Sequence, residues 1–140
     1  MNAKVSWSQR MTFTGSADSG FQVPLGTSPD VGGDEDGFRP MELLLVGLAG
    51  CTAMDVISLL QKKRQMVDAF EVQVQAERAE EHPRVFTRIR MEYVVTGKNI
   101  EREAVERSVQ LSANKYCPAQ AMFKQLLPLE LVITIKETGG

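Results

Sequence analysis

Residues 40–51 read PMELLLVGLAGC, and this stretch decides how we interpret the fold. Pro40 suits the first position of a helix, where a backbone N–H is not needed. We expect the helix to continue to about Gln65. Its first half is apolar on nearly every side, which predicts burial all round.

A chain of 140 residues can hardly surround such a helix alone. A sheet must wrap the helix, or a second subunit must cover it. Small residues in the same stretch would allow another helix or sheet to approach closely: Gly47, Ala49, Gly50 and Ala53. We therefore predict a homodimer.

The segment before the helix predicts short strands and a long loop. Apolar positions at 5–7, 11–13 and 21–25 indicate strands, and Gly15–Gly20 is expected to form a turn. Residues 26–39 are rich in glycine and acidic side chains. This stretch is expected to be an exposed, mobile loop.

Two long strands with alternating polarity follow the helix. Residues 70–76 and 87–95 each place apolar side chains on one face and polar side chains on the other. A turn at residues 80–83 makes the pair an antiparallel hairpin with one wet side. The glutamines of the first strand should lie across from the arginines of the second.

The C-terminal third predicts two helices and a strand. Asn99 is the expected N-cap of a helix over about residues 100–115, with Glu103 and Arg107 spaced for an ion pair. A short helix over 118–127 and an alternating strand over 129–135 come next. The order of elements is typical of an α+β fold, and we expect a single domain over residues 1–140.

Composition and charge exclude several classes of protein. The net charge of -2 gives no basic field for nucleic acid or an anionic membrane surface. The longest apolar stretch, Leu43 to Met54, is too short to span a bilayer. Two cysteines among 140 residues do not indicate a disulfide-stapled secreted domain. A cytoplasmic location is the expectation, with no nucleic acid or membrane partner.

The two cysteines are the candidate chemical groups. Cys117 directly precedes Pro118, at a helix start where partial positive charge would lower the pKa of the thiol. Cys51 lies within the apolar helix, and Arg39 and Glu42 lie at that helix's start. Each cysteine is also consistent with a small buried apolar residue. One histidine, His82, is too little for a metal site with the cysteines.

The paired motifs resemble a known family. Residues 40–51, followed by Asn-Lys-Tyr-Cys-Pro at residues 114–118, are similar to the OsmC/Ohr proteins, which are osmotically inducible and organic hydroperoxide resistance proteins. The resemblance spans nearly the whole chain and is closest to an uncharacterised OsmC-like subgroup. It implies an intertwined homodimer in which a long central buried helix is wrapped by antiparallel sheets, with active sites at the subunit interface.

The resemblance also implies thiol peroxidase chemistry. Cys51 would attack an organic hydroperoxide and become a sulfenic acid, which would condense with Cys117 to a disulfide. An external thiol or dithiol would reduce that disulfide, and no cofactor or metal is expected. Nearby positive charge would stabilise the thiolate.

The sequence departs from the family at two positions. The family's functional glutamate directly follows the proline, where this chain has Met41, and Glu42 comes one residue later. The family's functional arginine precedes the helix, and both Arg10 and Arg39 qualify. Arg39 is preferred because it lies beside the helix start.

Two alternatives to peroxidase turnover stay open. The same scaffold is consistent with a redox-sensing or small-ligand-binding protein. It is also consistent with a stable dimer in which the cysteines merely fill the core.

Overall fold

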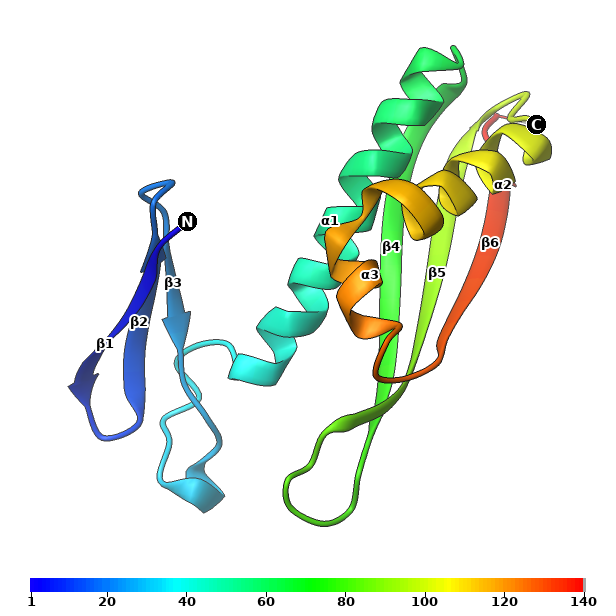
Figure 1. The fold of residues 1–140 in the computed structure, drawn as a ribbon. Coiled ribbons are helices and arrows are strands. Elements are labelled where there is room, and N and C mark those ends of the chain that lie inside the picture. The colour runs from blue at the N-terminus through cyan, green and yellow to red at the C-terminus, as the bar shows by residue number, and fades with distance from the viewer. Residues whose placement is uncertain (140) are drawn as a thin grey trace. The chain divides into compact units, whose positions relative to one another are not determined.

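The structure is a computed structural model that describes residues 1–139. It divides into two compact units, Met1–Val46 and a second that begins at Gly47. Figure 1 shows the elements of both units. The expectation of a single domain therefore stays a prediction.

The first unit contains a three-stranded antiparallel sheet. Its strands are β1 (Ala3–Gln9), β2 (Thr12–Ala17) and β3 (Gln22–Leu25), in the order β1-β2-β3. The turn predicted at Gly15–Gly20 was wrong at its beginning. Gly15 is a buried strand residue that pairs with Val5 on one side and Val23 on the other. A Cβ atom at position 15 would crowd the Val23 side chain, so glycine fits this strand position.

Residues 26–39 form the predicted irregular stretch, interrupted by a short 3₁₀ turn, η1 (Pro29–Val31). The stretch is fastened at both ends by backbone hydrogen bonds. Gly26 N–H donates to the Phe38 carbonyl at 3.0 Å, and Phe38 N–H donates to the Pro24 carbonyl at 2.9 Å. These bonds close the loop against β3.

Helix α1 runs over Pro40–Lys62 and begins at the predicted proline. Its buried residues, Leu48, Thr52, Val56 and Leu60, recur at every fourth position and form a single stripe. Other apolar side chains of α1 are exposed in the single chain: Leu44 at 48%, Val46 at 56% and Met54 at 74%. The burial on all sides that the sequence predicts is therefore not complete within the described single chain.

The length of α1 corrects one sequence expectation. With 23 residues, the helix is long and apolar enough to cross a membrane by length and composition. The sequence expectation counted only Leu43 to Met54, the most apolar part of the helix, and this part alone is too short to span a bilayer. A core helix of a water-soluble protein satisfies the same two criteria, so this feature assigns no location by itself.

The second unit contains a three-stranded mixed sheet. Strands β4 (Met66–Arg78) and β5 (Phe86–Lys98) are antiparallel, as predicted, and β6 (Leu129–Glu137) lies beside β5. β6 runs parallel to β5, which corrects the expectation of antiparallel sheets. The helices between β5 and β6 return the chain to the end where β5 began, and a parallel neighbour requires such a crossover.

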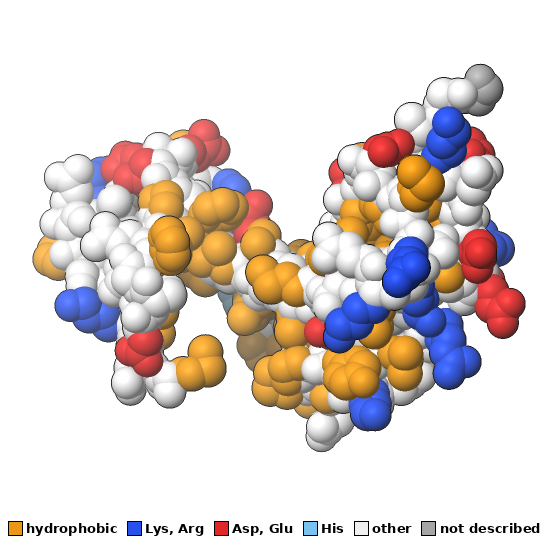
Figure 2. Space-filling view, turned by 90° about the horizontal axis from the view of Figure 1, so that it is seen from above, with side chains coloured by type: hydrophobic (Ala, Val, Ile, Leu, Met, Phe, Trp, Pro, Cys, Tyr) orange, Lys and Arg blue, Asp and Glu red, His pale blue; other side chains and the backbone are white. Residues whose placement is uncertain are grey.

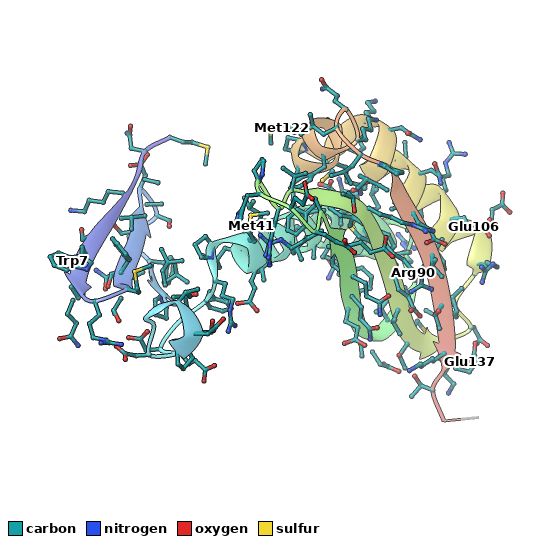
Figure 3. All side chains as sticks on the ribbon, turned by 90° about the horizontal axis from the view of Figure 1, so that it is seen from below. Trp7, Met41, Arg90, Glu106, Met122 and Glu137 are labelled. Carbon is teal, nitrogen blue, oxygen red and sulfur yellow. The ribbon has the colours of Figure 1, made fainter. Side chains whose placement is uncertain are left out.

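The two faces of this sheet differ in polarity, as the alternation predicts. Ile89, Met91, Tyr93 and Val95 of β5 are fully buried beneath the helices. On the other face, Gln75 pairs across from Arg90, as expected, and Arg90 lies within 3.8 Å of Glu130. Figure 3 labels Arg90 on this polar face.

The crossover corrects the prediction of one uninterrupted helix over residues 100–115. It consists of α2 (Arg102–Leu111), a π-helical turn η2 (Ser112–Tyr116) and α3 (Pro118–Phe123). Asn99 has a left-handed φ of 53° and is not the N-cap, which is Glu101. The ion pair on α2 joins Arg102 and Glu106 at 3.0 Å rather than Glu103 and Arg107.

The helices of the crossover lie on one face of the second sheet, together with the part of α1 that begins at Gly47 (Figure 1). Figure 2 shows hydrophobic side chains at the surface of each unit as well. Val5, Trp7 and Phe21 are exposed in the first unit, and Met54 and Met122 in the second. These exposed side chains are a second sign that the single chain leaves apolar surface uncovered.

Candidate functional site

The two cysteines lie together in the second unit. Cys51 is half-buried on α1, and Cys117 is 3% exposed between η2 and α3. Both are free thiols in the described chain. They are near enough for Cys51 to contribute to the raised pKa of the Cys117 thiol. Two residues far apart in the sequence thus share one site.

Local backbone geometry positions Cys117. The π-helical turn lets the Cys117 N–H donate to the Ser112 carbonyl at 2.8 Å, and Pro118 then begins α3. The Cys117 sulfur accepts the N–H of Gln120 at 3.3 Å, as an N-cap side chain does. π-Helical turns are frequent at functional sites, and this one ends at a candidate nucleophile.

The protonation of Cys117 differs from the expectation. Burial, with a smaller contribution from the neighbouring Cys51, raises the pKa of the Cys117 thiol to about 11. Hydrogen bonds from the backbone of Gln120 and Ala119 lower the pKa but do not outweigh burial. The prediction that a helix start would lower this pKa was wrong, because the loss of hydration dominates. Cys117 is therefore a neutral thiol at pH 7.

A buried polar network adjoins the two thiols. Thr52 Oγ1 lies 2.8 Å from Tyr93 OH and 2.8 Å from Ser112 Oγ. Gln120 Nε2 donates to both Thr52 Oγ1 at 2.9 Å and Tyr93 OH at 3.1 Å. All four residues are essentially inaccessible to solvent. Within residues 1–139, every buried side-chain nitrogen or oxygen has a hydrogen-bond partner.

The network ends at Asp55. Ser112 Oγ donates to Asp55 Oδ2 at 2.9 Å, and Asp55 is half-buried on α1. Burial raises the pKa of Tyr93, and the charges of Cys117 and Asp55 add to the rise, while its hydrogen bonds with Thr52 and Gln120 oppose it. Tyr93 is therefore a neutral hydrogen-bonding group at pH 7.

Glu42 and Arg39 lie in the first unit, at the start of α1. Glu42 Oε1 accepts the backbone N–H of Arg39 at 2.8 Å, which is one half of a capping box. The pKa of Asp30 is lowered mainly by a hydrogen bond from Ser28, and the charge of Arg39 contributes. Glu42 thus has a structural role, and whether either residue joins the thiols stays a prediction.

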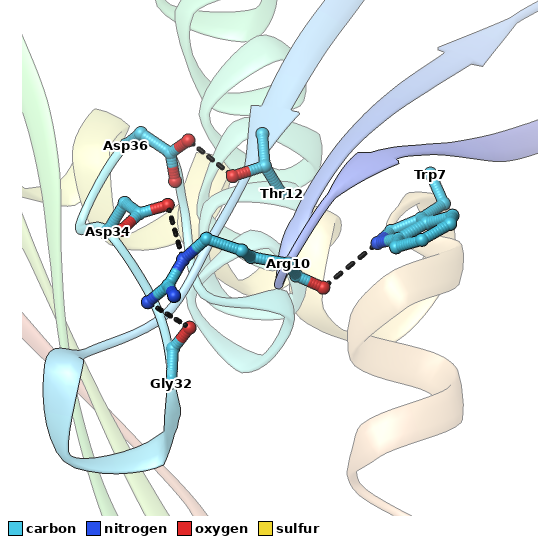
Figure 4. A network of polar contacts seen from close by, with 6 residues as sticks. All are labelled: Trp7, Arg10, Thr12, Gly32, Asp34 and Asp36. Carbon is cyan, nitrogen blue, oxygen red and sulfur yellow. Dashed lines mark hydrogen bonds and ion pairs between the residues drawn. The ribbon is translucent and has the colours of Figure 1, made fainter.

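Arg10, the alternative arginine, holds the irregular loop. Its Nε lies 3.2 Å from Asp34 Oδ2, and its Nη2 donates to the Gly32 carbonyl at 3.0 Å. Thr12 donates to Asp36 nearby, and Trp7 Nε1 donates to the Arg10 carbonyl (Figure 4). The loop is therefore pinned by polar contacts within the first unit, and Arg10 is already engaged.

The structure also gives the positions of Met41 and His82. Met41, at the family's glutamate position, is half-buried in the first turn of α1 and is labelled in Figure 3. His82 is exposed in the β4–β5 turn. No group of three potential metal ligands occurs in the described part of the chain.

Sequence reasoning missed the polar network. It assigned no role to any of the five residues of the network: Thr52, Asp55, Tyr93, Ser112 and Gln120. One signal was available, since hydroxyl groups on buried faces must find hydrogen-bond partners. Their common meeting point depends on tertiary structure.

Comparisons with known proteins agree on one family. The family model described as OsmC-like protein matches residues 32–132. Protein YhfA of Escherichia coli strain K12 is 42% identical over 125 residues, which cover 89% of this chain and 90% of YhfA.

Solved structures share the fold. A hypothetical protein from Aquifex aeolicus VF5 is 32% identical with a TM-score of 0.84, covering 97% of this chain and 96% of its own. A Legionella pneumophila protein described as an organic hydroperoxide resistance protein OsmC is 14% identical with a TM-score of 0.69, covering 95% of each chain. At that identity, the likeness concerns the fold alone.

Proposed function

Because the chain belongs to the OsmC-like family, we propose that it is a thiol-dependent peroxidase that reduces organic hydroperoxides through Cys51 and Cys117. The proposal is supported by two free thiols near enough for Cys51 to raise the pKa of Cys117. A disulfide requires both sulfurs to be neighbours, and this fold makes them neighbours from two distant segments.

The cycle begins at Cys51. Its thiolate attacks one oxygen of the hydroperoxide, so that an S–O bond forms as the O–O bond breaks. The alkoxide takes up a proton and leaves as an alcohol, and Cys51 is oxidised to a sulfenic acid. Cys51 is the better candidate for this step because it is more exposed than Cys117, which holds its proton at pH 7.

Cys117 completes the oxidation. Its sulfur attacks the Cys51 sulfur, an S–S bond forms, and the hydroxyl group leaves with the Cys117 proton as water. An external thiol or dithiol then reduces the disulfide by exchange and restores both thiols. No cofactor is needed for this sequence.

The assembly belongs to the proposal as well. The apolar side chains that α1 exposes support a homodimer, in which a second copy of the chain covers this helix. Arg39 and Glu42 are proposed to contribute charge at the assembled site, with Arg10 as the alternative arginine. A cytoplasmic location suits a cycle that requires reduced thiols.

Turnover with cumene hydroperoxide and dithiothreitol tests the function. The wild type should consume the peroxide, and Cys51→Ser should not, with an unchanged circular dichroism spectrum. Full turnover by Cys51→Ser would refute the assignment.

A second candidate function is redox sensing or small-ligand binding without turnover. It is favoured by Met41 at the glutamate position and by the capping role of Glu42. Oxidation of both thiols by peroxide, with no multiple turnover in the presence of dithiol, would support the sensor instead.

A further inference from the structure

The polar network connects both anchors of Cys117 to the residue beside Cys51. The first anchor is Ser112, whose carbonyl accepts the Cys117 N–H at 2.8 Å. The second is Gln120, whose backbone N–H donates to the Cys117 sulfur at 3.3 Å. The side chains of both anchors meet at Thr52 Oγ1. Thr52 directly follows Cys51 on α1.

The hydrogen bonds of this network have a fixed direction. A carboxylate only accepts, so Ser112 donates its proton to Asp55. Ser112 must then accept from Thr52, and Thr52 must accept from Tyr93. The two N–H groups of the Gln120 amide supply the remaining bonds, to Thr52 and Tyr93.

Thr52 is thereby used to its full capacity. A hydroxyl group donates one hydrogen bond and accepts two, and Thr52 donates to Ser112 while accepting from Tyr93 and Gln120. The same directions require the nitrogen of the Gln120 amide to point at the hydroxyl groups. Each hydroxyl group in this network has a fixed set of donors and acceptors. A different arrangement of the side chains would leave a buried polar group without a hydrogen-bond partner, so the network favours a single geometry.

We propose that Thr52, with Tyr93, Ser112, Gln120 and Asp55, positions Cys117 for disulfide formation with Cys51. This inference rests on the proposed function and assigns these residues to one step of it. They act through the hydrogen bonds that hold Cys117, so they are positioning residues. Their effect falls on the condensation of the Cys51 sulfenic acid with Cys117.

The condensation is the step that needs such support. The Cys117 sulfur must approach the Cys51 sulfur along the S–O bond that breaks, while its proton leaves with the departing hydroxyl group. A misplacement of reacting atoms by about 1 Å can cost about 100-fold in rate. The first step involves a freely diffusing peroxide and Cys51, so it depends less on where Cys117 lies.

Thr52→Val is the variant that tests the proposal. Valine keeps the shape of threonine and removes the one oxygen at which the network meets. Rapid acid quenching and mass spectrometry would follow sulfenic acid and disulfide after one equivalent of cumene hydroperoxide. Disulfide formation should slow by at least about tenfold, with sulfenic acid accumulating, because the two anchors lose their common partner. Thr52→Ser should restore most of the rate, since it keeps the hydroxyl group.

Ser108→Ala is the matched control. Ser108 is as buried as Ser112, but its hydroxyl group donates to the Ala104 carbonyl within α2, outside the network. Ser112→Ala should slow disulfide formation, and Ser108→Ala should leave it unchanged. If Thr52→Val does not fold, Tyr93→Phe with Ser112→Ala decides the question by the same measurement.

The outcomes separate this inference from the proposed function. Fast disulfide formation in the wild type and equally fast formation in the folded network variants would overturn the positioning role alone. Slowing of Ser108→Ala to the same degree as Ser112→Ala would also overturn it, because a general packing defect would then suffice. No Cys51–Cys117 disulfide in the wild type would overturn the proposed function, and this inference with it.

Discussion

Replacing Tyr93 with phenylalanine removes one oxygen atom from the centre of the second unit. Tyr93 is fully buried on β5, and its hydroxyl group forms hydrogen bonds with Thr52 at 2.8 Å and with Gln120 at 3.1 Å. A buried hydrogen bond contributes about 0.5–1.5 kcal/mol net, so two bonds give an upper range of about 1–3 kcal/mol. Thr52 and Gln120 keep their bond to each other. We therefore expect a loss of about 1–2 kcal/mol.

The chain contains a matched control for this change. Its second tyrosine, Tyr116, is 48% exposed, and its ring lies beneath the Lys115 ammonium group. Tyr116→Phe keeps that ring, so its free energy of unfolding should change by less than about 0.5 kcal/mol.

Urea unfolding followed by circular dichroism measures both variants. The slope of free energy against urea should stay constant if the folded state keeps its compactness. Equal stability losses for Tyr93→Phe and Tyr116→Phe would refute the claim that the network stabilises the unit.

Three further predictions concern the thiols and the assembly. Cys117→Ser should still oxidise at Cys51 but form no internal disulfide, and mass spectrometry after one equivalent of cumene hydroperoxide would show which product accumulates. A side chain at Gly50 would meet open space within the single chain, so any crowding must come from the partner in the proposed dimer. Gly50→Leu should therefore weaken the dimer by about 1–3 kcal/mol through overpacking, as measured by sedimentation equilibrium. Unchanged dimerisation would contradict burial of this helix face. Folding raises the pKa of Cys117 from its ordinary 9.0 to about 11, so the neutral thiol contributes stability that is fully present below pH 9.0 and is lost as the pH rises through 11. The free energy of unfolding of the wild type should therefore fall between these two pH values. Cys117→Ala, measured by the same urea unfolding, should lack this fall.

The repeating elements were predictable from local pattern. The alternation over residues 70–76 and 87–95 predicted the β4–β5 hairpin and the pairing of Gln75 with Arg90, because strand residues alternate between faces. Pro40 predicted the start of α1 for an equally local reason. These features depend on neighbours in the sequence.

Features that depend on tertiary contacts were not predictable in the same way. The parallel direction of β6 follows from the path of the crossover. The π-helical turn η2 interrupts a segment whose apolar spacing reads as one helix. The pKa of Cys117 is set by burial beneath other elements, which outweighs the local effect of the helix start.

The candidate site was predictable in its thiols and not in their surroundings. Cys51 and Cys117 came from the sequence motifs, and the structure places them near enough for Cys51 to raise the pKa of Cys117. Glu42 and Arg39 came from the same motif, and the structure gives Glu42 a capping role in the first unit. The hydroxyl and amide groups that meet at Thr52 come from three elements other than α1, so no spacing in the sequence reveals them.

The central claim is that Cys51 and Cys117 form one redox pair. Thiol titration with mass spectrometry, before and after one equivalent of an organic hydroperoxide, tests it most directly. Rapid loss of both thiols with a Cys51–Cys117 disulfide in the digest is the expected result. Persistence of both thiols would contradict the claim, and the fold would then serve as a ligand-binding or structural scaffold.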